Sequence, residues 1–161
     1  MENKRIVHIV NGAIALLQGE KRPLQSGVNE RAFAHRLAVH MEGHFSDWDV
    51  DCEYNKHRTM VKKLDGIKAC DAQKRTERIY PDIIIHKRTN DSPVEENLLV
   101  IEMKRNDACD PCDKKKLQLL TDLAGEYKYQ LGLYINIEEN QFIRTWYNNG
   151  EIIEEVRLLN K

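Results

Sequence analysis

The chain has 161 residues, of which 41% are hydrophobic and 32% charged, and its formal net charge is −1. This length suits one domain with a real hydrophobic core, and the composition excludes a disordered chain. A net charge near zero also excludes a global field that draws the protein to a polyanion. Contact with nucleic acid would therefore depend on local basic patches.

The sequence has no apolar run of about 18 residues, which a membrane-spanning helix would need. The charged start, Met1 to Arg5, is not followed by the apolar stretch of a signal peptide. We therefore expect a cytoplasmic protein without a membrane partner.

Two helices are expected in the first part of the chain, over residues 4–18 and from Asn29 to about Phe45. The apolar stripe of the first helix is Ile6, Ile9, Val10, Ala13, Leu16 and Leu17. The stripe of the second helix is Phe33, Ala34, Leu37, Ala38 and Met41. Asn29 is a good N-cap, and Glu30 lies at the start of the second stripe, where it is either a site residue or an acid favoured by the helix dipole.

A half-exposed strand is expected over residues 47–56, where apolar residues alternate with acids and Asn. The segment 56–78 then holds eight Lys or Arg residues against three acids. We interpret it as a long basic insertion between strands. It is either a solvated surface loop or a region that contacts phosphate groups.

Two buried strands are expected over residues 78–86 and 97–105, and both carry charge inside an apolar run. Asp82 lies in the first, and Glu102 and Lys104 lie in the second. Because strand side chains alternate between faces, Glu102 and Lys104 point the same way, and pairing of the strands can place Asp82 opposite Glu102. Two carboxylates and one ammonium on one face suit a metal ion and an activated water. The alternative is an ion pair at the edge of a strand.

The last third of the chain predicts a helix, a strand and a hairpin. Asp113 is the expected N-cap of a helix that runs to about Ala124. Its inward residues are Leu117, Leu120, Thr121 and Ala124. A strand over 130–137 follows, and a C-terminal hairpin over 141–158 is predicted to turn at Asn149-Gly150.

The four cysteines are Cys52, Cys70, Cys109 and Cys112. Cys109 and Cys112 form a CxxC pair, which has the spacing of half a zinc ribbon or of a redox pair. The alternative is that Cys52 is an ordinary strand residue and the others are loop thiols. Disulfides are not expected in a reducing cytosol.

The pattern Pro81-Asp82 followed by Glu102-x-Lys104 resembles the PD-(D/E)XK nuclease superfamily, over roughly residues 29–138. The resemblance implies an α/β fold of the restriction-endonuclease type, with an αβββαβ core, a mixed central sheet flanked by helices, and here an added C-terminal hairpin. Glu30 matches the acidic residue often found on the first core helix of the family. The whole chain, 1–161, would then be a single nuclease-like domain.

The same resemblance implies a metal-dependent nuclease acting on phosphodiester bonds, most readily those of DNA. Asp82, Glu102 and the carbonyl of Met103 would bind Mg²⁺, for which Mn²⁺ could substitute. Lys104 would orient or deprotonate the water and stabilise charge in the transition state. Glu30 would tune a metal-bound water or assist a second ion. Some relatives in this superfamily hold an iron–sulfur cluster with four cysteines, so the resemblance also leaves an iron–sulfur cluster open for the four cysteines here.

Nucleic acid is thus the expected partner, and assembly as a homodimer stays open. The candidate phosphate-binding residues of the basic insertion are Lys62, Lys63, Lys74 and Arg75. Asp113-Lys-Lys-Lys-Leu117 resembles a D-x-x-K-L sequence found after the ExK strand in some members. By that match Lys116 faces the substrate or the site, and the alternative is a surface lysine. Two other functions remain open: a non-catalytic nucleic-acid-binding module on this fold, and a metal-stabilised scaffold.

Overall fold

The structure is a computed structural model. It describes residues 1–20, 29–54, 56–57, 60–61, 79–88, 96–105, 111–138 and 141–159. The helices are α1 (Asn3–Gly19), α2 (Glu30–Glu42) and α3 (Pro111–Thr121). The strands are β1 (Asp49–Cys52), β2 (Lys56–His57), β3 (Met60–Val61), β4 (Ile83–His86), β5 (Asn97–Arg105), β6 (Leu131–Ile137), β7 (Gln141–Asn148) and β8 (Glu151–Leu159). Among the described residues, no helix combines the length and the apolar character needed to cross a membrane.

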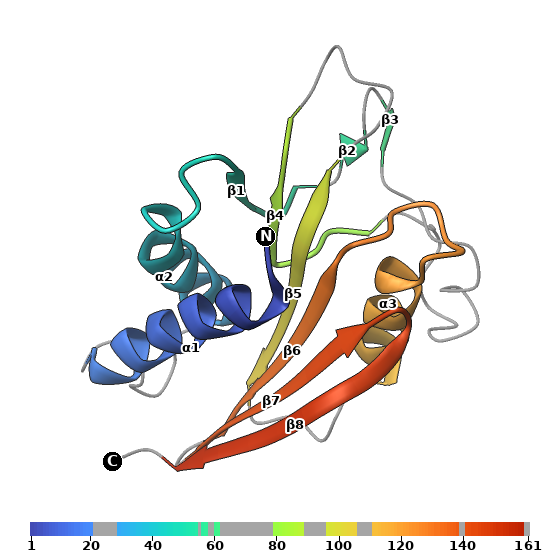
Figure 1. The fold of residues 1–161 in the computed structure, drawn as a ribbon. Helices are drawn as coiled ribbons and strands as arrows, with labels where there is room; N and C mark the ends of the chain where they lie inside the picture. The colour runs from blue at the N-terminus through green and yellow to red at the C-terminus, as the bar shows by residue number, and fades with distance from the viewer. Residues whose placement is uncertain are drawn as a thin grey trace.

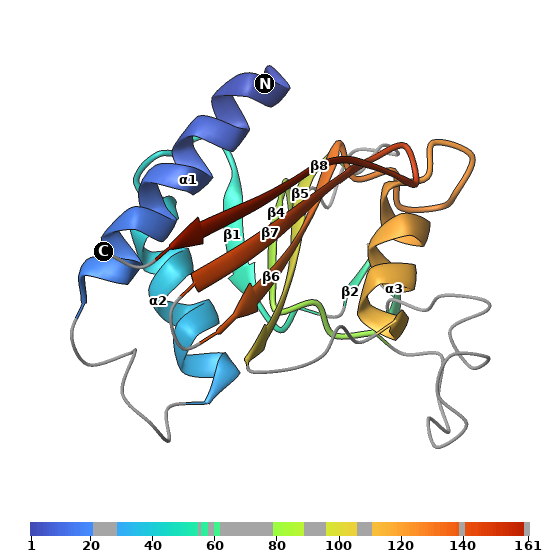
Figure 2. The same cartoon turned by 90° about the horizontal axis from the view of Figure 1, so that it is seen from below.

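A six-stranded mixed sheet forms the centre of the fold, in the order β1-β4-β5-β6-β7-β8 (Figure 1). Only β5 and β6 in this sheet are parallel, and α3 makes the crossover between them. Helices α1 and α2 cover one face and α3 covers the other (Figure 2). The expected α/β class and the mixed sheet flanked by helices are confirmed.

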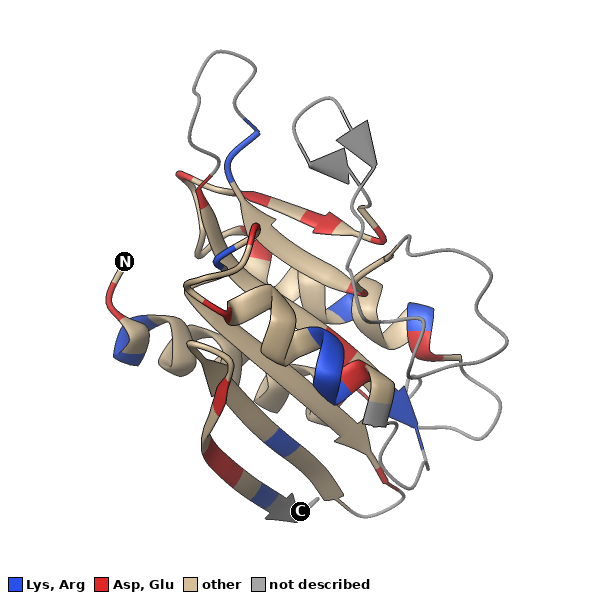
Figure 3. Cartoon of the chain, turned by 90° about the vertical axis from the view of Figure 1, so that its right-hand side faces the viewer, with Lys and Arg blue, Asp and Glu red and all other residues tan. Residues whose placement is uncertain are grey.

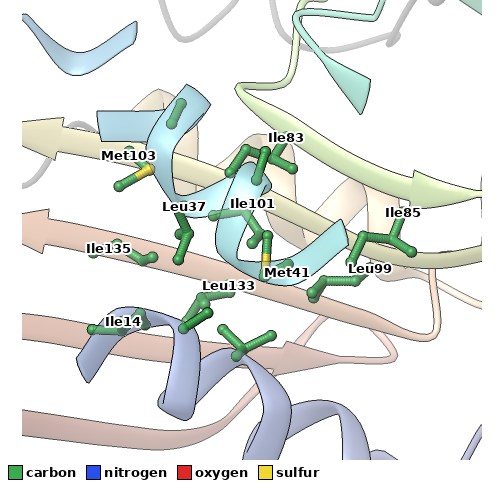
Figure 4. Close-up of a cluster of buried hydrophobic side chains, with 14 of the residues drawn as sticks. Ile14, Leu37, Met41, Ile83, Ile85, Leu99, Ile101, Met103, Leu133 and Ile135 are labelled. Carbon is green, nitrogen blue, oxygen red and sulfur yellow. The ribbon is translucent and has the colours of Figure 1, made fainter. Parts of the chain in front are cut away.

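The larger hydrophobic core lies between the sheet and the pair α1 and α2 (Figure 4). All five residues of the predicted α2 stripe are buried. The α1 stripe was partly wrong, because Leu16 is 57% exposed whereas Ile14 is buried. Ile6, Val10 and Ile14 follow one another at i, i+4, i+8, so they stay on one helical face, and Leu16 falls outside it.

Strands β4 and β5 contribute side chains to both hydrophobic cores, one on each face of the sheet. Their register pairs Ile83 with Ile101, and both side chains enter the core under α1 and α2. Ile84 and Val100 point to the opposite face, into a smaller core beneath α3. The same alternation carries Glu102 to the α3 face, as the sequence predicted.

Helix α3 packs closely on β6 because β6 carries Gly132 at the contact. A Cβ at Gly132 would lie 2.9 Å from Thr121 Cγ2, a distance that real contacts do not reach. Leu117, Leu120 and Thr121 are buried, as predicted. Ala124 was predicted wrongly, since it is exposed and follows the end of the helix.

The predicted C-terminal hairpin is confirmed. Asn148 pairs with Glu151 across a two-residue turn, in which Asn149 and Gly150 have φ values of 49° and 75°. These left-handed conformations match the Asn-Gly preference of tight hairpins. The turn is also fastened to α3, because Gly150 N donates to Thr121 Oγ1 and Leu123 N donates to Asn149 Oδ1.

Several predicted boundaries were too wide. The strand expected over 47–56 extends only from Asp49 to Cys52, and the strand expected from residue 78 begins at Ile83, after Pro81. Proline has no N–H to donate to a ladder, which explains the later start. Within the basic insertion 56–78, β2 and β3 pair as a small antiparallel ladder. The remaining residues of that insertion lie outside the described part of the chain.

Candidate active site

Charged side chains gather at the carboxyl end of β5, where the first turns of α2 and α3 approach the same edge of the sheet. Glu102 and Lys104 come from β5, Glu30 comes from α2, and Asp113 and Lys116 come from α3. Figure 3 displays acidic and basic segments side by side on α3 and on the strand behind it. The cluster, completed by Asp82 before β4, is called the β5 site below.

Asp82 is held against β5 by the backbone. Its Oδ2 accepts a hydrogen bond of 2.7 Å from Met103 N. The register Ile83 to Ile101 then sets Asp82 across from Glu102 on the neighbouring strand. Burial raises the pKa of Asp82 to about 6, and the Met103 N–H and the nearby lysines only partly offset that rise.

Glu102 is 3% exposed, and its environment is unusual for a carboxylate. Its Oε1 forms an ion pair of 2.9 Å with Lys116 Nζ. Burial raises the pKa of Glu102 to about 8, against the pull of the Lys116 ammonium. Burial therefore outweighs this ion pair in its effect on the pKa of Glu102.

The positions of Asp113 and Lys116 differ most from those predicted from the sequence. Lys116 is 7% exposed, so the surface-lysine alternative is wrong. Its Nζ lies 2.9 Å from both Glu102 Oε1 and Asp113 Oδ1. Burial alone would lower the pKa of Lys116, but Glu102 and Asp113 outweigh it and raise that pKa.

Asp113 was predicted only as an N-cap, whereas α3 begins at Pro111 and places Asp113 in the first turn. It is 4% exposed. A signal for both residues was present in the sequence. Asp113 and Lys116 precede the inward Leu117 and Leu120 at helical spacings that put all four on one face.

Lys104 connects the two helices that approach the end of β5. Its Nζ lies 3.4 Å from Glu30 Oε2 and 3.5 Å from Asp113 Oδ2. Arg105 N donates to Glu30 Oε1 at 3.2 Å, which fixes the Glu30 carboxylate against the strand. Burial acts to lower the pKa of Lys104, but Asp113 and Glu30 raise it on balance, so this amine stays protonated at neutral pH.

Whether a divalent cation fits the β5 site depends on the balance of carboxylate and ammonium groups there. Glu30, Asp82, Glu102 and Asp113 supply four carboxylates, and Lys104 and Lys116 supply two ammonium groups. Fully ionised, the cluster carries −2, but the raised pKa of Glu102, about 8, keeps that carboxyl group protonated at neutral pH. Oε1 of Glu102 and Oδ2 of Asp113 are buried and face Lys116 Nζ at 2.9 Å and Lys104 Nζ at 3.5 Å.

Hard oxygen donors suit Mg²⁺, and binding of that ion would displace the proton that the raised pKa of Glu102 retains at neutral pH. No group of three or more His, Cys, Asp and Glu side chains placed to hold a metal ion occurs within the described ranges. The predicted ligand set consists instead of two carboxylates, Asp82 and Glu102, together with the Met103 carbonyl.

A pocket of about 570 Å³ opens beside this cluster. Its described lining consists of Glu30, Arg31, Glu53, Tyr80 and Asp82. A second hollow of about 400 Å³ shares Glu30 and Arg31 with it and is lined also by Asn29 and Arg105. Solvent and a ligand of moderate size can thus reach Asp82 and Glu30 from the α2 side.

Several other predicted site residues lie outside the described part of the chain or away from the β5 site. Lys62, Lys63, Lys74 and Arg75 belong to residues that the structure does not describe, and so do Cys70 and Cys109. Cys52 is exposed on β1 and Cys112 is buried on α3, so the expectation of a loop thiol at Cys112 was wrong. The proposed cysteine metal site therefore stays a prediction.

Comparison of the chain with protein-family models, with curated proteins and with solved structures gave no match.

Proposed function

We propose that this chain is a metal-dependent nuclease that hydrolyses phosphodiester bonds of nucleic acid, with DNA as the expected substrate. The proposal includes a restriction-endonuclease-like fold of the PD-(D/E)XK type. Its support in the element order is the succession α2, β1, β4, β5, α3, β6, which matches the αβββαβ order implied by the sequence resemblance.

One observation carries the proposal: Asp82, Glu102 and Lys104 converge with Glu30 at a sheet edge that borders a pocket. A buried cluster with a deficit of positive charge costs stability unless a cation or proton compensates it. Function is the simplest reason for a chain to keep such a cluster, because perturbed carboxylates in a cleft are typical of catalytic sites.

Asp82, Glu102 and the Met103 carbonyl would hold Mg²⁺. When bound, that ion would polarise the phosphate and lower the pKa of a water molecule. The protein's own contribution would be to position the carboxylates that bind the ion. The Met103 N–H fixes the direction of the Asp82 carboxylate, while burial keeps bulk water away from Glu102.

The two lysines have different surroundings and therefore different proposed roles. Lys104 is partly exposed, with 27% of its side chain accessible, so it can contact a phosphate oxygen or a water molecule. Lys116 is more deeply buried between Glu102 and Asp113, and it is suited to hold those carboxylates in place. Glu30, joined to Lys104 and to Arg105 N, orients the exposed lysine.

The primary experiment incubates the protein with supercoiled plasmid, linear duplex, single-stranded DNA and RNA. Each substrate is tested with Mg²⁺, with Mn²⁺ and with chelator. We expect cleavage of at least one substrate, dependent on the metal. Absence of cleavage from every combination would refute the nuclease proposal.

A calorimetric titration with Mn²⁺ tests the ligand set separately. Asp82→Ala and Glu102→Ala should each abolish the binding event. Glu151→Ala is the matched control, because Glu151 is an exposed acid on β8, at the far edge of the sheet. Unchanged binding in both site variants would remove Asp82 and Glu102 from the ligand set.

The alternative is a non-catalytic nucleic-acid-binding or metal-stabilised module on the same fold. The observation that favours it is the Lys116 ammonium, which already lies 2.9 Å from Glu102 and supplies charge to the cluster. That module would bind nucleic acid or metal ions without cleaving any substrate. The incubation and the titration together separate the two functions.

A further inference from the structure

Tyr80 has an unusual position for an aromatic residue in this protein. Its relative exposure is 51%, and in the described part of the chain it is the only aromatic residue among the large exposed hydrophobic ones. It also lines the same pocket as Asp82 and Glu30. An apolar ring is thus presented to solvent at the mouth of the β5 site.

The backbone on both sides of Tyr80 is anchored. Ile79 is 2% exposed and packs in the core beneath α3, and Pro81 is buried as well. A following proline restricts the backbone of Tyr80 to extended conformations. Two residues later, Asp82 is tied to Met103 N. The aromatic side chain therefore projects from a fixed support, and its entropy cost on binding a ligand is small.

Two guanidinium groups lie among the carboxylates of the hollows beside Tyr80. Tyr80 lines the larger hollow together with Arg31, Glu30, Glu53 and Asp82, and the Nε of Arg31 lies 2.8 Å from Glu53 Oε1. Arg31 also lines the second hollow. Arg105 lines the second hollow, where its guanidinium stacks over Phe33 at 5.7 Å. The two hollows share Glu30 and Arg31, so a strand of nucleotides that runs from Tyr80 toward Arg105 would pass two guanidinium groups and also the carboxylates of Glu30 and Glu53.

We infer that Tyr80 is a stacking platform for an unpaired nucleobase and that the substrate class is single-stranded nucleic acid, with Arg31 and Arg105 near its phosphates. A base inside a duplex is stacked on both faces by its neighbours and offers no face to a protein ring. An unpaired base offers one, and stacking on an aromatic side chain tolerates any base. This inference deepens the proposed function and rests on it wherever cleavage is concerned.

The experiment measures binding and cleavage independently. Binding is followed by fluorescence anisotropy in chelator, with a labelled single-stranded oligonucleotide that has no self-complementary segment and with the blunt duplex that it forms with its complement. Tyr80→Ala should weaken single-strand binding by about tenfold, the scale of one lost base stack, and should leave duplex binding unchanged. Tyr80→Phe should keep the affinity of the parent, because stacking needs the ring and not the hydroxyl.

Tyr80→Leu separates stacking from mere hydrophobic contact. Leucine retains apolar bulk without a flat face, so it should behave like alanine. Leu123→Ala is the control, since Leu123 is 59% exposed and does not line either hollow. A single-strand probe with 2-aminopurine at successive positions should show one position whose fluorescence is quenched by the parent and by Tyr80→Phe, and not by Tyr80→Ala.

The outcomes of binding and cleavage are distinguishable. If no substrate is cut with Mn²⁺ but single-strand binding depends on Tyr80, the stacking platform stands and the nuclease proposal falls. If the parent cuts nucleic acid while Tyr80→Ala binds and cuts single strands like the parent, the nuclease proposal stands and this inference is overturned. Failure of the parent to bind single strands in chelator also overturns it.

Discussion

Two charged clusters lie on the same sheet, and they differ in how their carboxylates are satisfied. At the β1–β4 edge, Asp51 Oδ2 accepts hydrogen bonds of 2.9 Å from His86 Nε2 and from Arg88 Nε, and its Oδ1 accepts from Arg88 Nη2. In the β5 site, Oε1 of Glu102 and Oδ2 of Asp113 instead face lysine ammonium groups, Lys116 Nζ at 2.9 Å and Lys104 Nζ at 3.5 Å.

The difference separates a structural ion pair from a candidate catalytic cluster. Arginine offers a rigid fork of donors that matches a carboxylate, so Asp51 gains fixed hydrogen bonds. The β5 site has lysines instead, and each lysine is shared between two carboxylates. Because one ammonium is divided between two carboxylates, a further cation would stabilise them, whereas both oxygens of Asp51 already accept hydrogen bonds.

The largest expected effect comes from Lys104→Met. Methionine keeps much of the apolar stem, so the protein should fold, and removal of the ammonium should leave Mn²⁺ affinity equal or higher. Cleavage should fall by about 10² or more, the usual scale for a lost charge-stabilising group. Cleavage rates, Mn²⁺ titration and thermal melts on one preparation check this prediction.

Lys87→Met is the matched control for Lys104→Met, because Lys87 lies beside the β1–β4 cluster and pairs with Glu96 at 2.6 Å. It should cut at the parent rate. A Lys104→Met protein that folds, binds Mn²⁺ and cleaves as fast as the parent would show that Lys104 has no catalytic role.

A second prediction concerns pH. The pKa values of Asp82 and Glu102, about 6 and about 8, lie above those of the unfolded chain. The metal-free folded state therefore binds more protons between pH 4 and 8, and its stability should fall as the pH rises through this window. Metal must displace the Glu102 proton, so Mn²⁺ affinity should rise about tenfold per pH unit from pH 6 to 8.

Calorimetry at several pH values, in two buffers of different ionisation enthalpy, measures both the affinity and the protons released. Thermal melts of the metal-free protein supply the stability trend. Mn²⁺ affinity that stays constant from pH 6 to 8 would contradict the link between these carboxylates and the metal.

The smallest effects come from matched amide substitutions in the two clusters. Asp51→Asn should lower the free energy of unfolding by about 1 kcal/mol, since Arg88 is half exposed and its pairing is screened by solvent. Its cleavage rate should not change.

Asp113→Asn removes the carboxylate that Lys104 and Lys116 share, and its cleavage should fall by about tenfold because both lysines lose their positions. Equal cleavage rates for the two variants would contradict the assignment of a catalytic role to the β5 site and a structural role to the β1–β4 cluster.

Much of the fold was predictable because the hydrophobic periods are strong. The α2 stripe, the buried strand through Ile101 and the Asn-Gly turn each satisfy one local rule, and each was predicted correctly. The ends of elements were less predictable. They depend on tertiary packing, as for Phe45, which is buried in the core after α2 has ended at Glu42.

The candidate site was predictable where charge interrupts an apolar strand, as at Glu102. It was missed where charge lies in a charged stretch. Lys114, Lys115 and Lys116 are three identical residues in a row, and only helical spacing to Leu117 and Leu120 distinguishes the third, which α3 buries. Tyr80 was not predicted as a site residue, because its place in the lining of a pocket depends on the tertiary structure.

The fastening of the hairpin turn to α3 has a consequence for the timing of folding during synthesis. Thr121 and Gly150 are 29 residues apart, so the ribosome makes the anchor of α3 on the order of seconds after α3 itself. Until then the carboxyl end of α3 lacks its hydrogen bonds to the turn, whereas Lys104 and Glu102, the β5 partners of Asp113 and Lys116, have already been made. The last anchor of α3 to be synthesised therefore belongs to the end of the helix that lies away from the charged cluster.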